Sequence, residues 1–180
     1  PDPTKLHIHP WLTHGAPFRI DLASSTFAPL PLAGGPHWRE GTEDFTESAF
    51  HPPLMSLRIV HPRLPFWPVE LAPSIAGSNS TPMMNINNVL RGLHQGLHKH
   101  MGQVDWNSLT EGDQQAVTGA FKARCRAEAV RIGGSPEQLR NWEIKTISEG
   151  VRRVDFLQGR TTFKGLVPIP EASSLLLLTA

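Results

Sequence analysis

The chain has 180 residues, with 17 Lys and Arg against 16 Asp and Glu, and its formal net charge is +1 at pH 7. This balance lacks the strong basic excess that is typical of nucleic-acid-binding domains. The single cysteine excludes an intramolecular disulfide and favours a reducing, intracellular location in the cytoplasm or the nucleus. No apolar run approaches the roughly 18 residues that a membrane span needs, so we expect no membrane partner.

Proline is concentrated in the first part of the chain, since 13 of the 17 prolines lie within residues 1–80. We interpret residues 1–17 as an N-terminal arm and residues 18–180 as a single domain. Apolar and charged residues alternate over residues 18–22, and this period predicts a half-buried strand. Residues 23–53 follow as a long proline-rich loop, and such a loop in a compact domain is usually functional or mobile.

The next predicted elements are a hairpin and two helices. Alternating apolar residues predict strands over residues 55–61 and 66–72. Pro68 inside the second strand predicts a sheet edge or a bulge, because proline has no N–H to donate. Apolar residues at helical spacing then predict helices over residues 84–101 and 111–131.

The last part of the chain is predicted to return to strands. A short third helix is expected over residues 135–142, followed by a hairpin of strands at 151–157 and 161–166 and a last strand at 175–178. The order of strands, then helices, then strands is typical of the α+β class. We therefore expect a mainly antiparallel sheet of five or six strands, with two main helices packed on one face.

Four segments together carry a pattern that resembles a known family. They are HPWL at 9–12 with FRIDL at 18–22, SLRIV at 56–60 with LPFWPVEL at 64–71, AFKARC at 120–125, and GVRRVDFL at 150–157 with Gly159-Arg160, Phe163 and Gly165-Leu166. The family they resemble is an uncharacterised one, found mostly in basidiomycete fungi. The resemblance spans nearly the whole chain and implies a small, intracellular α+β domain of fungal origin with no assigned activity.

Histidine supplies the candidate metal site. His94 and His98 are four residues apart on a predicted helix and therefore share a face, a spacing compatible with zinc or another transition metal. The helical zinc motif has a Glu between its histidines, and here the intervening residues are Gln95-Gly96-Leu97. The alternative is a solvated helix edge with no cofactor.

Two aspartates within predicted strands are a second set of candidate functional residues. Asp21 and Asp155 occupy positions where aspartate is depleted, so each requires a partner or a function. The cations near them along the sequence are Arg19, Arg152, Arg153 and Arg160. We favour a buried polar network of Asp21, Arg153 and Asp155 that fixes the sheet over a catalytic role, because structural ion pairs are also found inside domains.

Basic residues of the last hairpin are a candidate nucleic-acid surface. Arg152, Arg160 and Lys164 are predicted to share one face, with no aromatic side chain between them. Surfaces that bind single-stranded nucleic acid usually interleave stacking aromatics with the charge. Nucleic-acid binding is therefore an alternative that we do not favour.

The aromatic pair Phe66 and Trp67 is the candidate recognition surface, because aromatic residues are enriched at the energetic centres of interfaces. The sequence contains no Gly-x-Ser-x-Gly elbow, no Walker loop and no Gly-x-Gly-x-x-Gly motif. We therefore expect a non-enzymatic protein-interaction or ligand-binding domain with a protein partner. A metal-dependent enzyme or metal binder and a nucleic-acid binder remain the alternatives.

Overall fold

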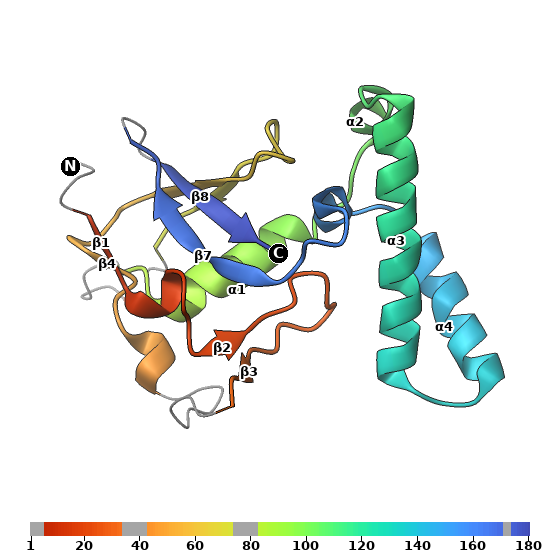
Figure 1. The fold of residues 1–180 in the computed structure, drawn as a ribbon, viewed down its shortest axis with the longest axis horizontal. Coiled ribbons are helices and arrows are strands. Elements are labelled where there is room, and N and C mark those ends of the chain that lie inside the picture. The colour runs from red at the N-terminus through yellow and green to blue at the C-terminus, as the bar shows by residue number, and fades with distance from the viewer. Residues whose placement is uncertain (1–5, 34–42, 74–82, 171–173) are drawn as a thin grey trace.

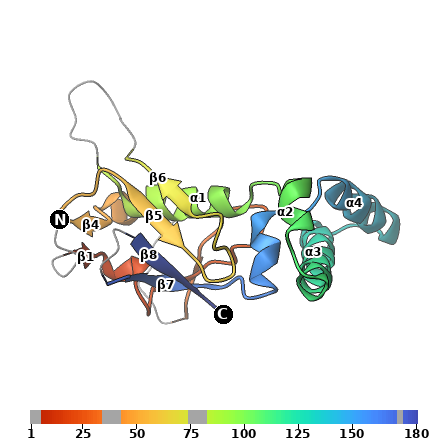
Figure 2. The same ribbon diagram turned by 90° about the horizontal axis from the view of Figure 1, so that it is seen from above.

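The computed structural model describes residues 6–33, 43–73, 83–170 and 174–180. Within these residues, a β-rich body with one helix lies at one end, and a pair of antiparallel helices extends away from it at the other (Figure 1). The same separation is visible from above (Figure 2). A short 3-10 helix lies at the junction and joins the two parts.

The largest sheet has four strands in the order β6-β5-β8-β7. Its strands are β5 (Leu57–Val60), β6 (Val69–Leu71), β7 (Phe163–Pro168) and β8 (Ser174–Thr179). The pairs β5–β6 and β7–β8 are antiparallel hairpins, whereas β5 and β8 run parallel. The sheet therefore joins one hairpin from the middle of the chain with another from its end.

The register of β5 shows which side of the sheet meets the core. Ile59 lies opposite Val69 of β6 and opposite Leu175 of β8. All three side chains are buried. Because neighbouring residues of a strand point to opposite faces, this alternation defines the face that packs inward.

Several short elements cover the end of this sheet nearest the N-terminus. They are β1 (His7–Ile8), η2 (Pro10–Leu12), β2 (Phe18–Arg19), β3 (Leu30–Pro31), η3 (Glu43–Thr46) and β4 (Phe50–His51), where η denotes a 3-10 helix. β1 pairs with β4 and β2 pairs with β3, each antiparallel. Leu12 is fully buried, so this part of the chain contributes to the core.

Helix α1 (Ile86–Leu97) packs closely against the edge strand β6. A reciprocal capping box between Asn85 and Asn88 begins it, with Asn85 accepting the Asn88 N–H at 2.7 Å. Its two glycines allow the close approach. A Cβ at Gly92 would lie 2.5 Å from a methyl of Leu71, and a Cβ at Gly96 would lie 2.7 Å from a methyl of Val69.

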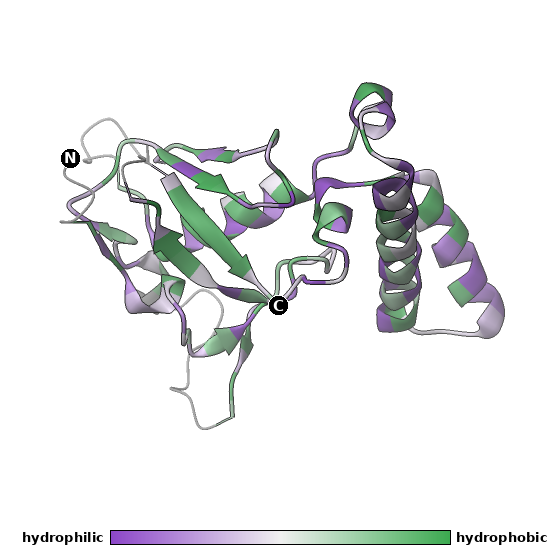
Figure 3. Ribbon diagram, turned by 45° about the horizontal axis from the view of Figure 1, so that its top comes forward, coloured by the Kyte–Doolittle hydropathy of each residue, from purple (hydrophilic) through white to green (hydrophobic). Residues whose placement is uncertain are grey.

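The remaining helices are α2 (Gln103–Asn107), α3 (Glu111–Ile132) and α4 (Pro136–Ser148). Thr110 and Ser135 cap the second and third of these by accepting hydrogen bonds from backbone N–H groups. α3 and α4 pack as an antiparallel pair, and α3 also rests on η4 (Arg153–Leu157). Hydrophobic residues are concentrated in the strands, while hydrophobic and hydrophilic residues are mixed along α3 and α4 (Figure 3).

The α+β class is confirmed, and the finer architecture is not. The largest sheet among the described residues has four strands, and only α1 of the two main predicted helices packs against it. The predicted strand at 151–157 is wrong, because η4 occupies most of it. Residues 154–157 are all buried, including Asp155, so their burial does not alternate as a strand's would. The third predicted helix is longer than expected and ends at Ser148.

Across the described segments, no helix combines the length and the apolar content that crossing a bilayer requires.

Candidate functional site

The first candidate is a cavity of about 380 Å³, here called the aromatic cleft. Three segments line it: the β5–β6 connection with Phe66 and Trp67, the start of α3 with Leu109 and Val117, and η4 with Phe156. These segments are distant in sequence, so only the tertiary fold creates the cavity. Ligand sites in proteins typically combine such apolar walls with a few polar groups.

The floor of the aromatic cleft is packed and its rim is open. The rings of Trp67 and Phe156 meet edge to face with centroids 4.9 Å apart, and Phe156 is buried. The ring of Phe66 lies edge to face with that of Trp67, with centroids 6.2 Å apart, and Phe66 is 78% exposed. The arrangement therefore presents one large, accessible aromatic side chain beside a fixed one.

Local hydrogen bonds hold the β5–β6 connection in place. The N–H of Trp67 donates to the carbonyl of Leu64 at 3.1 Å, and the N–H of Leu64 donates to His61 at 2.8 Å. Leu64 is buried, and Arg63 donates to the Gln158 side chain at the end of η4. The wall that carries the two aromatics is thus tied both to the core and to η4.

Polar side chains complete the lining of the aromatic cleft, and they are Arg63, Ser108, Thr110, Asp113 and Gln158. The Trp67 indole N–H has no hydrogen-bond acceptor among the described residues. Asp113 lies at the rim, where the Thr110 hydroxyl donates to its carboxylate at 2.7 Å. The aromatic walls are therefore accompanied by the free indole N–H, the Asp113 carboxylate, and the Arg63 and Gln158 side chains, which bond to each other.

A buried ion pair joins α3 to η4. The guanidinium of Arg124 donates to both carboxylate oxygens of Asp155, at 2.7 and 3.0 Å, and the side chains are 6% and 1% exposed. Asp155 also accepts the backbone N–H of Arg152 at 2.8 Å. Burial alone would lower the pKa of Arg124, but the hydrogen bonds and charge of Asp155 raise it. This pair fixes the helical pair to the body.

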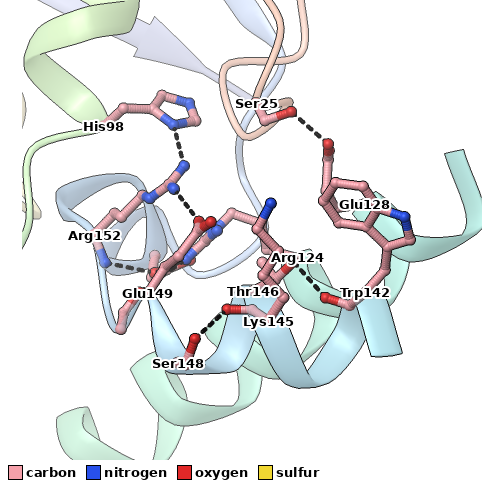
Figure 4. A network of polar contacts seen from close by, with 12 residues as sticks. Ser25, His98, Arg124, Glu128, Trp142, Lys145, Thr146, Ser148, Glu149 and Arg152 are labelled. Carbon is pink, nitrogen blue, oxygen red and sulfur yellow. Dashed lines mark hydrogen bonds and ion pairs between the residues drawn. The ribbon is translucent and has the colours of Figure 1, made fainter. Parts of the chain in front are cut away.

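Arg152 connects the same junction to α1 (Figure 4). Its guanidinium donates to Nδ1 of His98 at 2.9 Å and to the carboxylate of Glu149 at 2.6 Å. Ser25 donates to Glu128 of α3 nearby, which ties the loop after β2 to the helical pair. The junction is therefore a network of structural contacts between three parts of the chain.

The candidate metal residues His94 and His98 stack on each other with ring centroids 4.2 Å apart. Their Nε2 atoms donate to the carbonyls of Ser24 and Leu22, at 2.8 and 2.9 Å. Burial, the neighbouring His94 and the nearby arginines lower the pKa of His98 to about 4, and burial also lowers that of His94. Both rings are therefore neutral at pH 7.

The described residues contain no group of three His, Cys, Asp or Glu side chains that could hold a metal ion. At His98 both ring nitrogens already have partners, Leu22 and Arg152. A metal held by both rings would have to displace the bond of His98 to Leu22 or its bond to Arg152. The metal site stays a prediction, and the observed contacts give the two rings a structural role.

The other predicted site residues are placed apart from one another. Asp155 is buried with Arg124, whereas Asp21 is exposed and accepts the Thr161 hydroxyl at 2.7 Å. Arg153 uses its backbone N–H to reach the Lys99 carbonyl, and its Nε is buried with no partner among the described residues. The structure thus does not join the three residues of the predicted polar network.

The residues of the predicted basic surface differ in their contacts. Arg152 donates to Glu149 and His98, while Arg160 is exposed after η4. Lys164 is exposed on β7 and lines a second cavity. A shared basic face stays a prediction.

Sequence reasoning missed Arg124, the partner of Asp155. Arg124 lies towards the C-terminal end of the helix predicted over residues 111–131, where cations are common and need no partner. The available signal was its spacing, since Val117, Arg124 and Glu128 recur at helical intervals on the side of α3 that meets the body. A buried position for an arginine indicates a carboxylate partner.

The comparison with protein families matches residues 11–174 to a family described as a family of unknown function (DUF6699). No curated protein and no solved structure matches the chain. The match confirms that the chain falls in an uncharacterised family, as its sequence pattern indicates. The fungal source stays a prediction.

Proposed function

The chain belongs to this family of unknown function, and we propose that it is a non-enzymatic binding domain whose aromatic cleft receives an extended, proline-containing peptide segment of a partner protein. The observation that carries the proposal is Phe66, which is 78% exposed at the rim of a cavity whose floor is the packed Trp67. A large aromatic side chain left in water beside a preformed cavity is typical of an interface anchor.

The chemistry of the cleft favours a peptide of this kind. Proline-rich segments in the polyproline II conformation bind grooves lined by aromatic rings, because the preformed ligand loses little entropy. Their backbone has no internal hydrogen bonds, so ligand carbonyls remain free to accept. The unpaired indole N–H of Trp67 supplies a donor for such a carbonyl.

The state of the reactive side chains supports binding over catalysis. Burial raises the pKa of the Cys125 thiol, which keeps it protonated and inert. His98 is neutral, and both of its ring nitrogens are hydrogen-bonded to other groups. Neither group is placed to act on a molecule bound in the aromatic cleft.

A peptide-display selection tests the proposal. The native chain is used as bait, and selected peptides are counter-screened against the Phe66→Ala variant. The matched control is Met55→Ala, which removes another exposed apolar side chain that does not line the cleft. We expect proline-containing peptides that bind Phe66→Ala at least about tenfold more weakly, a loss of about 1.4 kcal/mol, and bind Met55→Ala as they bind the native chain.

Two results would contradict the proposal. One is a set of peptides that binds native and Phe66→Ala proteins with equal affinity. The other is an equal loss in the Met55→Ala control, because that would place binding on general surface hydrophobicity.

A further inference from the structure

The second cavity, here called the basic cleft, has a volume of about 510 Å³. It shares no lining residue with the aromatic cleft. Its lining includes the basic side chains of Arg19, Lys164 and His14. It also includes the apolar side chains of Phe18, Phe163 and Leu32. We propose that the basic cleft binds a small organic anion that has an apolar body and a carboxylate or phosphate head. The proposal is independent of the peptide site.

The charge arrangement is the first argument. Asp21 bridges Thr162 in antiparallel pairing, and the N–H of Phe163 donates to the Ile20 carbonyl at 2.9 Å. These contacts bring the segment after β2 beside the start of β7, and the side chains of Arg19 and Lys164 both line the basic cleft. Two like charges near one another repel, so an anion bound between them is favoured.

No acidic side chain among the described residues lines the cleft to neutralise these cations. Neither Arg19 nor Lys164 makes an ion pair within the described residues. Asp21 is the nearest acid along β2, but its carboxylate already accepts the Thr161 hydroxyl and the Ala23 N–H. The positive charge of the cleft is therefore available to a ligand.

The wall of the basic cleft is built by close packing. The chain after η2 crosses β7 at Gly165, where a Cβ would lie 2.6 Å from the carbonyl carbon of Thr13 and 2.7 Å from the nitrogen of His14. The φ of Gly165 is +129°, a value that side chains rarely allow. The Thr13 hydroxyl fixes the same turn by donating to Pro10 at 2.8 Å. The wall is thus preformed.

The lining selects the ligand chemistry. Arginine and lysine bind carboxylate and phosphate oxygens through charge-assisted hydrogen bonds, and Arg19 can do so through two parallel bonds. Phe163 is buried, while Leu32 is 47% exposed and gains from being covered. A cavity of this volume lies in the range of roughly 300–1,000 Å³ that small-molecule sites occupy.

Isothermal titration calorimetry with octyl phosphate and octanoate tests the proposal. Octanol has the apolar body without charge, and inorganic phosphate has the charge without the body. The variants are Arg19→Met and Lys164→Met, both at exposed positions, and the matched control is Arg160→Met, an exposed arginine that does not line the cleft. Amide shifts of Gly15 and Gly165 locate the bound molecule.

We expect at least one of the two amphiphilic anions to bind, and to bind about tenfold more weakly to each cleft variant. Octanol and inorganic phosphate should bind more weakly than that anion, and Arg160→Met should behave as the native chain. Failure of both anions to bind would overturn the proposal. Equal weakening by Arg160→Met, octanol binding as tight as that of the anion, or binding only to vesicles of phosphatidic acid would overturn it as well.

Discussion

Replacement of Arg124 by methionine tests how the helical pair is held to the body. The change keeps an unbranched side chain but removes two charge-assisted hydrogen bonds, of 2.7 and 3.0 Å, to Asp155. It leaves the carboxylate, which is 1% exposed, with only the backbone N–H of Arg152. Breaking one side of a buried pair costs about 3–5 kcal/mol, and we expect a loss of that size.

Urea unfolding measures this loss, and thermal unfolding should show a fall of roughly 6–20 °C in Tm for a domain of this size. The double variant Arg124→Met with Asp155→Asn removes the stranded charge, so it should recover at least about 1 kcal/mol relative to Arg124→Met. A loss below about 1 kcal/mol in the single variant, or a double variant whose losses simply add, would refute the reasoning.

The remaining predictions concern glycine and pH. Gly165→Ala should lower the free energy of unfolding by about 2 kcal/mol or more, because its φ is +129° and its Cβ would meet the Thr13 backbone. A Cβ at Gly119 would meet nothing within 4 Å, so Gly119→Ala should raise the free energy of unfolding by about 0.5–1 kcal/mol. Urea midpoints that rank the two variants in the opposite order would contradict this packing. The free energy of unfolding should also fall as the pH drops from about 6.5 towards 4. The cause is His98, whose pKa is about 4 in the folded protein, so the unfolded chain binds the proton first. The loss from this one group is at most about 3 kcal/mol. Equal urea midpoints at pH 7 and pH 5 would contradict that assignment.

Local patterns predicted the elements whose stability is local. The helix that begins after Thr110 has its N-cap and its apolar spacing within one segment, and the hairpin of β5 and β6 alternates as a half-buried pair should. The strand predicted at 151–157 failed for a non-local reason. Asp155 is buried because Arg124, 31 residues earlier, supplies its charge partner, and that contact favours a 3-10 turn over a strand.

The arrangement of the sheet could not be predicted from local patterns. β5 and β8 pair in parallel although more than 100 residues separate them, and no turn between them sets their register. The same limit applies to the aromatic cleft. Phe66 and Trp67 stand out in the sequence, but their opposite wall comes from Val117 and Phe156, which only the folded chain brings near.

The most direct test of the peptide site is fluorine NMR of the chain labelled with fluorotryptophan. The five tryptophans give five signals, and Trp67→Phe identifies one of them. On addition of a peptide selected by the native chain, the account predicts that the Trp67 signal shifts more than the other four. Saturable binding of that peptide with an unchanged Trp67 signal would contradict the account.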